Sequence, residues 1–208
     1  MKKRLLTALA VISLSFTQAQ EVKFGTKVGL NISNLAGDVS DANNKIGFHI
    51  GGFAEIELSD TFSLQPEILY STQGTKSEQN FYFPSGGLNI DLTQKLSYLN
   101  IPIMAKLYLV ENFYIEVGPQ IGFLLTAEQI GEASGSIYGQ PYTSSETIDN
   151  KDSLNSTDFG LNTGLGIKLS ERFGAGVRYS LGLSNIDKET KNSEVNNRNI
   201  GISLMYNL

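Results

Sequence analysis

The 208-residue chain contains no cysteine, no tryptophan and a single histidine, His49. Without cysteine, the chain cannot form disulfides, thiolate metal sites or a cysteine nucleophile. No apolar run beyond the N-terminal segment approaches the ~18 residues that a transmembrane helix needs. The formal net charge is −5 and no basic stripe is present, which argues against nucleic acid as a partner.

The first part of the chain has the organisation of a secretory signal peptide. Positive residues at 2–4 are followed by an apolar segment at 5–16 and a small-residue cleavage site, Thr17-Gln18-Ala19. We therefore expect a signal peptide at residues 1–20 and a mature domain at residues 21–208. An amphipathic first helix is the alternative, but the apolar segment has no polar face. Export fits a soluble periplasmic protein as well as an outer-membrane protein, so the remaining sequence must decide.

Alternation of apolar residues with polar residues or glycine is clearest over residues 157–185. Phe159, Leu161 and Leu165 belong to the apolar set, and a Ser170-Glu171 turn divides the stretch into two arms. A period of two places successive side chains on opposite faces of a strand. Each arm is long enough for a tilted crossing of a bilayer, which takes about 9–11 residues. The pattern predicts a membrane-spanning hairpin.

The same alternation predicts eight strands in all. They are expected at about residues 22–33, 45–58, 62–73, 95–109, 113–127, 157–169, 173–183 and 198–208. The connections alternate between long and short, so that all short turns fall at one end, as in bacterial transmembrane barrels. We predict an all-β fold: an eight-stranded antiparallel up-and-down transmembrane β-barrel in the bacterial outer membrane, with short periplasmic turns and long outer loops.

Aromatic residues near the strand ends support this orientation. A periplasmic ring is expected from Phe24, Phe62, Phe113, Phe173 and Tyr206, and an outer ring from Tyr70, Phe123 and Phe159. Barrels carry such girdles at both interfaces. The alternative is that strands simply favour aromatic residues.

Three prolines, Pro66, Pro102 and Pro119, fall inside predicted strands. Proline cannot donate a ladder hydrogen bond and is usually confined to sheet edges or bulges. We therefore predict β-bulges at these positions.

Charged residues fall on the faces that would line the barrel interior. An eight-stranded barrel has room inside only for its own side chains or one small ligand, and buried charges require partners. We predict an ion-pair network in which Glu67 and Glu116 bind Lys27, Lys106 and Arg178. This network would plug the lumen; a polar conduit or proton path is the alternative.

No motif predicts catalysis, a cofactor or a metal. Glu55 and Glu57 lie on one strand face, but a filled barrel offers no sugar cleft between two carboxylates. His49 has no partner ligands at metal-binding spacing, and no GxxxxGK phosphate loop occurs. The acidic residues of 128–156 lack the EF-hand spacing for calcium, and a solvated acidic loop is the simpler interpretation. We expect neither an enzyme nor a cofactor-dependent protein.

The mature chain resembles the outer-membrane β-barrel family often called PorT-like or "porin family", common in Bacteroidetes-type bacteria. The resemblance rests on FGTKVGLNISNL (24–35), FSLQPEILYSTQG (62–74), LNIPIMAKLYL (99–109) and FYIEVGPQIGFLL (113–125). The last strand, at residues 201–206, also resembles the signal that the barrel-assembly machinery reads. The resemblance implies an outer-membrane barrel, and a few members of the family assist type IX secretion.

Fold alone does not determine function, but loops on a rigid scaffold often carry it. We expect a small monomeric barrel, surrounded by outer-membrane lipid, with a structural or surface-interaction role through loops 74–94 and 128–156. Partners would be extracellular or secretion proteins. An accessory component of protein secretion and a narrow small-solute channel are the alternatives. A soluble lipocalin-like binder would need an apolar interior, which reverses the predicted orientation of the side chains.

Overall fold

The structure of the chain is a computed structural model that describes residues 21–38, 42–84, 86–188 and 194–208. These residues form one 3₁₀ helix, η1 (Lys151–Ser153), and nine strands: β1 (Val22–Gly37), β2 (Asn43–Ser59), β3 (Phe62–Phe83), β4 (Gly86–Val110), β5 (Phe113–Ile137), β6 (Gln140–Asp149), β7 (Thr157–Lys168), β8 (Phe173–Gly182) and β9 (Val195–Asn207). No helix in this part of the chain is long and apolar enough to cross a membrane. The signal peptide predicted for residues 1–20 lies outside the described residues.

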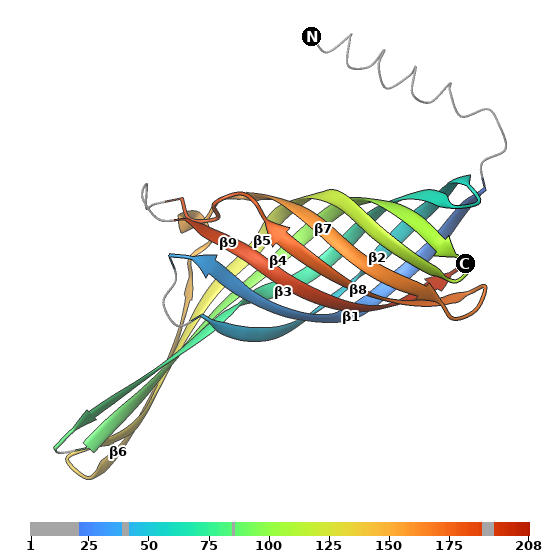
Figure 1. Cartoon of the computed structure of the whole chain (residues 1–208). Helices are drawn as coiled ribbons and strands as arrows, with labels where there is room; N and C mark the ends of the chain where they lie inside the picture. The colour runs from blue at the N-terminus through green and yellow to red at the C-terminus, as the bar shows by residue number, and fades with distance from the viewer. Residues whose placement is uncertain (1–20, 39–41, 85, 189–193) are drawn as a thin grey trace, which may run out of the picture.

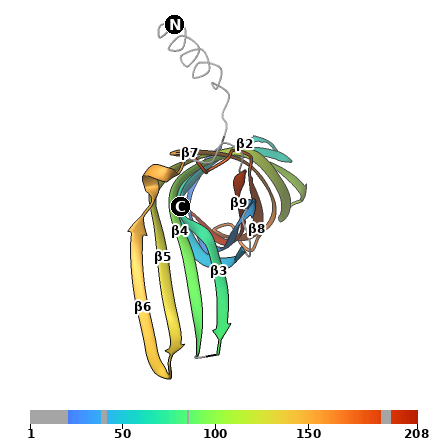
Figure 2. The same ribbon diagram turned by 90° about the vertical axis from the view of Figure 1, so that its left-hand side faces the viewer.

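Eight of the strands close into a ring in the order β1-β2-β3-β4-β5-β7-β8-β9. Each neighbouring pair is antiparallel, and β9 pairs back onto β1. Figure 1 shows the barrel from the side, and Figure 2 shows the ring after a 90° turn. Because every ring strand has a neighbour on both sides, the backbone of the wall finds its hydrogen-bond partners within the protein. The predicted eight-stranded up-and-down barrel is confirmed.

The short turns lie together at one end of the barrel. Residues 59–62 join β2 to β3, residues 110–113 join β4 to β5, and residues 168–173 join β7 to β8. The C-terminus lies at the same end (Figure 1). This end corresponds to the periplasmic side of the predicted barrel.

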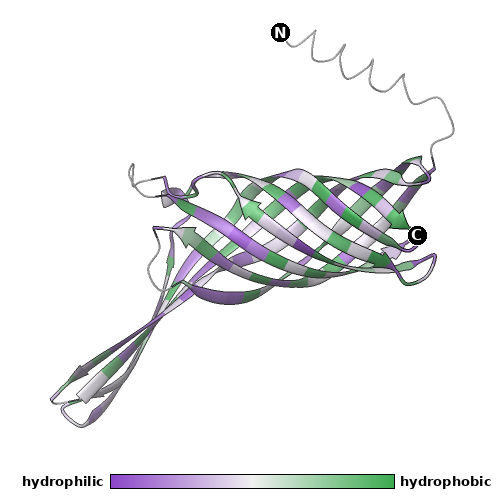
Figure 3. Ribbon diagram, in the orientation of Figure 1, coloured by the Kyte–Doolittle hydropathy of each residue, from purple (hydrophilic) through white to green (hydrophobic). Residues whose placement is uncertain are grey.

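The apolar rows of the strands face outward, and the charged rows face the lumen. Leu30 and Leu165 are 60% and 50% exposed, whereas Lys27 and Glu67 are 4% and 1% exposed. Hydrophobic residues occur along the whole barrel wall in Figure 3. A continuous exposed apolar wall suits hydrocarbon rather than water.

Aromatic side chains lie near both ends of the wall. At the short-turn end, Phe24 and Phe173 are exposed, and Phe173 packs against Tyr206 with the ring centroids 5.1 Å apart. At the other end, the rings of Tyr70 and Phe48 lie 5.9 Å apart, so Phe48 joins the predicted outer group. Girdles at both interfaces are typical of transmembrane barrels.

The three strand prolines do not form the predicted bulges. At each proline, two successive residues of the strand are not paired with the preceding strand; the prolines are Pro66, Pro102 and Pro119. Beyond these two residues, the pairing resumes in the same register. A proline has no N–H to donate, so hydrogen bonding is lost locally. The pairs on either side of each gap hold the strands in place without an extra residue.

The segments 74–94 and 128–156, predicted to be loops, are largely strands. β3 continues to Phe83, β4 begins at Gly86, and β5 continues to Ile137 before β6. β6 pairs only with β5, at the end of the strand order. The outer parts of β3, β4, β5 and β6 therefore form a four-stranded sheet that leaves the ring on one side (Figures 1 and 2). We call it the projecting sheet; it comprises residues 75–83, 86–95, 128–137 and 140–149.

The exposed apolar wall generates a prediction for Leu165, which lies near the middle of β7. Leu165→Arg is expected to destabilise the barrel in lipid by about 2–4 kcal/mol, because a cation near the bilayer midplane loses its hydration. Leu169→Arg, on the same row but at the short turn, is the control and is expected to cost about 0–1 kcal/mol. Urea unfolding in lipid vesicles, followed by heat-modifiable gel mobility, measures both. Equal effects of the two substitutions would contradict a membrane-facing wall.

Candidate functional site

Four charged side chains meet inside the lumen and form the central cluster: Lys27, Glu67, Glu116 and Arg178. Glu67 accepts hydrogen bonds from Lys27 Nζ at 2.6 Å and from Arg178 Nη2 and Nη1 at 2.8 and 2.9 Å. Glu116 accepts one from Arg178 Nε at 2.7 Å. Two cations and two anions balance, so this buried set carries no net charge. An unmatched charge at this depth would cost several kcal/mol.

Arg178 joins opposite walls of the barrel. It lies on β8, whereas Glu67 lies on β3, four strands away in the eight-stranded ring. The planar guanidinium donates two parallel hydrogen bonds to Glu67 and still has Nε free for Glu116. Gln65 Nε2 adds a hydrogen bond to Glu67 at 2.6 Å. The central cluster therefore crosses the lumen and fills its width.

Lys106 does not join the central cluster as expected. Its Nζ lies 3.0 Å from Glu55 Oε2 and 4.4 Å from the centroid of the Tyr114 ring. Glu55 also accepts hydrogen bonds from Ser63, at 2.9 Å, and from Tyr108. Glu116, which lies directly opposite Lys106 in the β4–β5 ladder, is taken by Arg178. Lys106 therefore forms a second neutral pair nearer the short-turn end.

Glycines on β7 make room for these large inward side chains. A Cβ added to Gly166 would collide with the Tyr114 ring, and one added to Gly164 would lie 2.9 Å from Glu116 Oε1. The lumen is narrow, so a large residue on one strand requires a small residue on its neighbour. The inward glycines are thus the counterpart of the charged and aromatic residues.

A layer of neutral hydrogen bonds lies beside the central cluster, around His49. The Asn31 side-chain amide donates to the Ser71 hydroxyl at 2.9 Å, so Asn31 Oδ1 is the atom that accepts from His49 Nδ1 at 2.8 Å. In this tautomer His49 Nε2 carries no proton and accepts from the Ser203 hydroxyl at 2.9 Å. His49 is 5% exposed. Its two ring nitrogens are both occupied by neutral partners, so a structural role accounts for this histidine.

Apolar side chains close the lumen at the outer end. They form one buried cluster of Leu35, Leu96, Tyr98, Leu124, Ala127 and Ile186. Beside it, Asn197 donates to Tyr98 at 3.2 Å and to Asp158 at 2.7 Å. The lumen is therefore lined by polar side chains along most of its length and closed by an apolar cap at its outer end.

The cavities that remain inside are small. One, beside Lys27, His49 and Arg178, has a volume of about 30 Å³, and another, beside Lys106 and Tyr114, has about 20 Å³. Such spaces hold one or two water molecules. A recess of about 450 Å³ lies at the short-turn end, beside Lys23, Glu111 and Glu171.

The projecting sheet has one apolar face and one polar face. Residues directly opposite in the ladders point to the same side, and successive rows alternate between sides. One face carries Phe81, Phe83, Leu88, Ile90, Leu92, Ile137, Tyr142 and Ile148. By alternation, this apolar face continues the side of β4 on which Leu96 enters the outer cap.

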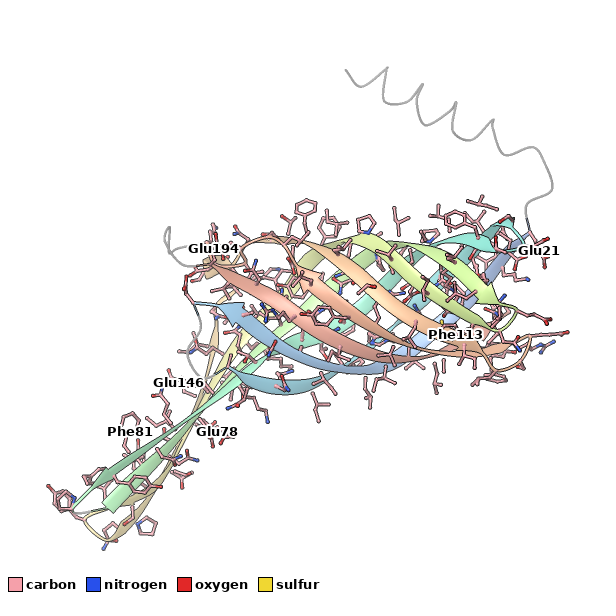
Figure 4. The ribbon with its side chains drawn as sticks, viewed as in Figure 1. Glu21, Glu78, Phe81, Phe113, Glu146 and Glu194 are labelled. Atoms are coloured by element: carbon pink, nitrogen blue, oxygen red, sulfur yellow. The ribbon has the colours of Figure 1, made fainter. Side chains whose placement is uncertain are left out.

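The polar face carries an uninterrupted acidic row. Glu78, Asp91 and Glu132 lie opposite one another on β3, β4 and β5. Like charges directly opposite each other on a sheet repel. Figure 4 shows Glu78, Phe81 and Glu146 on the projecting sheet, far from Glu21 at the other end of the molecule.

Residues 18–188 match the family described as "Outer membrane protein beta-barrel domain". The chain belongs to this family. It is therefore a small bacterial outer-membrane protein, and its short turns face the periplasm. No curated protein matches the chain.

Two outer-membrane proteins of known structure are similar to this barrel. Ail, the attachment invasion locus protein of Yersinia pestis, has a TM-score of 0.46 at 14% identity, over 90% of this chain and 99% of Ail. Neisserial surface protein A has a TM-score of 0.41 at 13% identity, over 89% of this chain and 98% of that chain. Both TM-scores are below 0.5, so the assignment of the chain to outer-membrane β-barrel proteins rests on the family match.

Sequence reasoning missed several residues that complete the outer-membrane barrel's lumen. Glu55 was placed on one strand face with Glu57 but not paired with Lys106, and Tyr108 and Tyr114 were not assigned to the network. Alternation identifies all three as inward-facing. It does not say how far a long side chain reaches across the lumen, and this reach decides the partners.

At the periplasmic rim, outside the membrane-spanning part, Glu57 pairs with Lys23 at 2.7 Å. This hydrogen bond is the main reason that the pKa of Lys23 lies above its ordinary value. Both side chains are partly exposed, so water screens the pair and its contribution to stability is small.

The central cluster generates a prediction for Glu67. Glu67→Gln keeps the side-chain shape but leaves Lys27 and Arg178 with only Glu116 as a carboxylate partner. We expect a loss of about 3–5 kcal/mol in unfolding free energy, because an uncompensated charge remains buried. The control is Glu128→Gln, which removes the exposed pair with Lys95 at 3.3 Å and is expected to cost less than about 1 kcal/mol.

Adding Lys27→Met to the Glu67→Gln variant restores neutrality, since Arg178 and Glu116 remain as a pair. The double variant is therefore expected to recover part of the lost stability in urea unfolding. Equal stability of the Glu67→Gln and Glu128→Gln variants would show that the central cluster does not support the barrel.

Proposed function

We propose that this outer-membrane protein is a closed barrel that anchors the projecting sheet outside the cell, where the sheet contacts partner proteins. The observation that carries the proposal is the amphipathic, four-stranded projecting sheet itself. A sheet with one apolar face usually packs that face against another layer. Among the described residues, no element covers the apolar face of this sheet, so a surface-interaction role accounts for it.

The filled lumen supports an anchoring role over a channel. The central cluster, the Lys106–Glu55 pair and the outer apolar cap occupy successive levels of the interior. The ring also leaves no unpaired strand edge in the membrane, which supports a monomeric barrel. We propose that the interior acts as a structural plug and that no cofactor or catalytic step is involved.

We also propose that the chain belongs to the PorT-like group within its family. The segments that carry this resemblance fall on β1, β3, β4 and β5, and the last three are neighbours in the barrel wall. A secretion-accessory role remains the second hypothesis, because secreted cargo is one class of protein that the projecting sheet could contact. Blocked surface delivery of cargo after gene deletion would favour it.

The plug generates a prediction about conductance. The mature barrel, reconstituted in a planar bilayer, is expected to show no steady current at the level of a porin, because the interior of an eight-stranded barrel is filled by side chains. The projecting sheet stays intact in this measurement. Stable porin-level currents would contradict the plug and favour the small-solute channel.

The anchoring role generates a prediction about deletion. Replacing residues 76–93 and 130–147 with Asn-Gly turns removes most of the projecting sheet, and Thr75–Gln94 and Gln129–Ile148 remain as the closing pairs. The shortened barrel is expected to fold and reach the outer membrane, because the ring and its plug are unchanged. Attachment of living cells to surfaces coated with extracellular protein is expected to be lost.

The matched control for this deletion replaces the periplasmic turn residues Glu111 and Asn112 with Asn and Gly. This variant is expected to attach as the unmodified protein does. Heat-modifiable gel mobility verifies folding of both forms, and attachment that survives the deletion would reject the proposed function.

A further inference from the structure

We propose that β6 is a docking edge that takes an extended, basic strand of a partner protein, which adds a fifth strand to the projecting sheet. This inference rests on the proposed surface role and names the chemistry of its partner. Three features of the projecting sheet support it: the free edge of β6, the acidic charge around this edge, and the difference between the two faces of the sheet.

The first observation is the free edge. β6 pairs with β5 along all ten of its residues, from Gln140 to Asp149, and no strand of the described residues pairs with its other side. All ten residues are exposed. An edge of this length offers backbone N–H and C=O groups to an added strand.

The edge also lacks two of the features that usually block strand addition, lysine and a β-bulge. β6 has no lysine, and its ladder with β5 shows no bulge. One proline, Pro141, lies at its tip, away from the remainder of the edge. The other edge of the projecting sheet differs: β3 carries Lys76, which is still paired with β2 at Asn43.

The second observation is the charge along the β5–β6 hairpin. Residues 128–149 contain four carboxylates, Glu128, Glu132, Glu146 and Asp149, and no lysine or arginine. Glu128 pairs with Lys95, whereas the other three carboxylates form no salt bridge within the described residues. Glu146 lies on the apolar face, whereas Glu132 and Asp149 lie on the polar face. A basic partner would neutralise Glu132 and Asp149, and it would also relieve the repulsion along the row of Glu78, Asp91 and Glu132.

The third observation fixes the pattern of the added strand. Tyr142 and Ile148 lie on the apolar face of β6, whereas Ser145 and Asp149 lie on the polar face, with Glu132 opposite Ser145. A partner strand that alternates apolar and basic residues would extend the apolar face on one side. On the other side, its long basic side chains would reach Asp149 and, over the small Ser145, Glu132.

The test uses the absence of cysteine from the chain, which makes a single introduced cysteine unique. Ser144→Cys places a thiol on the β6 edge, and Gln79→Cys places one on the β3 edge in the same row and on the same face. The probe is a ten-residue peptide of alternating Arg and Val with one central Cys. It is added under mild oxidation to the full-length mature protein in lipid nanodiscs.

We expect the mixed disulfide to form at Ser144→Cys at least roughly tenfold faster than at Gln79→Cys, because strand addition holds the two thiols together. The same peptide with Glu in place of Arg, or methylated on its backbone nitrogens, is expected to lose this preference. Equal trapping at the two edges, or trapping that backbone methylation does not change, would overturn the docking edge.

The charge requirement is tested by equilibrium binding of the fluorescent peptide without cysteine. Glu132→Gln together with Asp149→Asn is expected to weaken binding roughly tenfold, and added salt is expected to weaken it as well. The matched control, Glu78→Gln with Asp91→Asn, removes the same charge from the same face but farther from β6, and is expected to change binding less than about twofold. Equal weakening by the two pairs would overturn a site at β6.

The inference and the proposed function fail in different ways. If the deletion abolishes cell attachment while Ser144→Cys captures no peptide, the projecting sheet still carries the surface role and only the β6 edge is rejected. If the shortened barrel still attaches, the surface role itself is rejected.

Discussion

Closure of the barrel is the constraint on which the other features depend. The ladder between β1 and β9 joins thirteen residue pairs, from Gly25–Asn207 to Gly37–Val195, and turns an open sheet into a ring. A membrane interior offers no water to an unpaired backbone group, so only a closed wall is stable there. Closure also creates a narrow interior without lipid, and the charged residues of the strands must all share it. Their mutual neutralisation follows from the geometry of the wall.

The sequence was sufficient to predict which side chains face the lumen, but not which of them pair with one another. Alternation placed Lys27, Glu67 and Arg178 on the inward faces because the side-chain period of a strand is fixed. It could not show that Arg178 pairs with both Glu67 and Glu116 while Lys106 pairs with Glu55. The choice of partner depends on the rotamers of side chains that cross the lumen. The apolar cap was missed for a related reason: its members come from separate strands and from the segment around Ile186.

The outer strands were missed because their local sequence is poor in strand formers. Residues 74–94 and 128–149 contain many Gly, Asn and Asp residues, which are depleted in strands. Alternation is present in Leu88, Ile90 and Leu92, but it becomes informative only when the hairpins are paired side by side. Pairing between β3 and β4 continues in one register from the barrel wall, so the ring acts as a template that extends weak strands beyond the membrane.

The acidic row of Glu78, Asp91 and Glu132 has a consequence for the environment in which the protein works. The three carboxylates repel one another across adjacent strands, and dissolved ions weaken such repulsion. The Debye length falls from about 30 Å at 0.01 M salt to about 10 Å at 0.1 M. Salt thus favours the paired form of the outer strands, while the ion pairs buried in the lumen are screened much less.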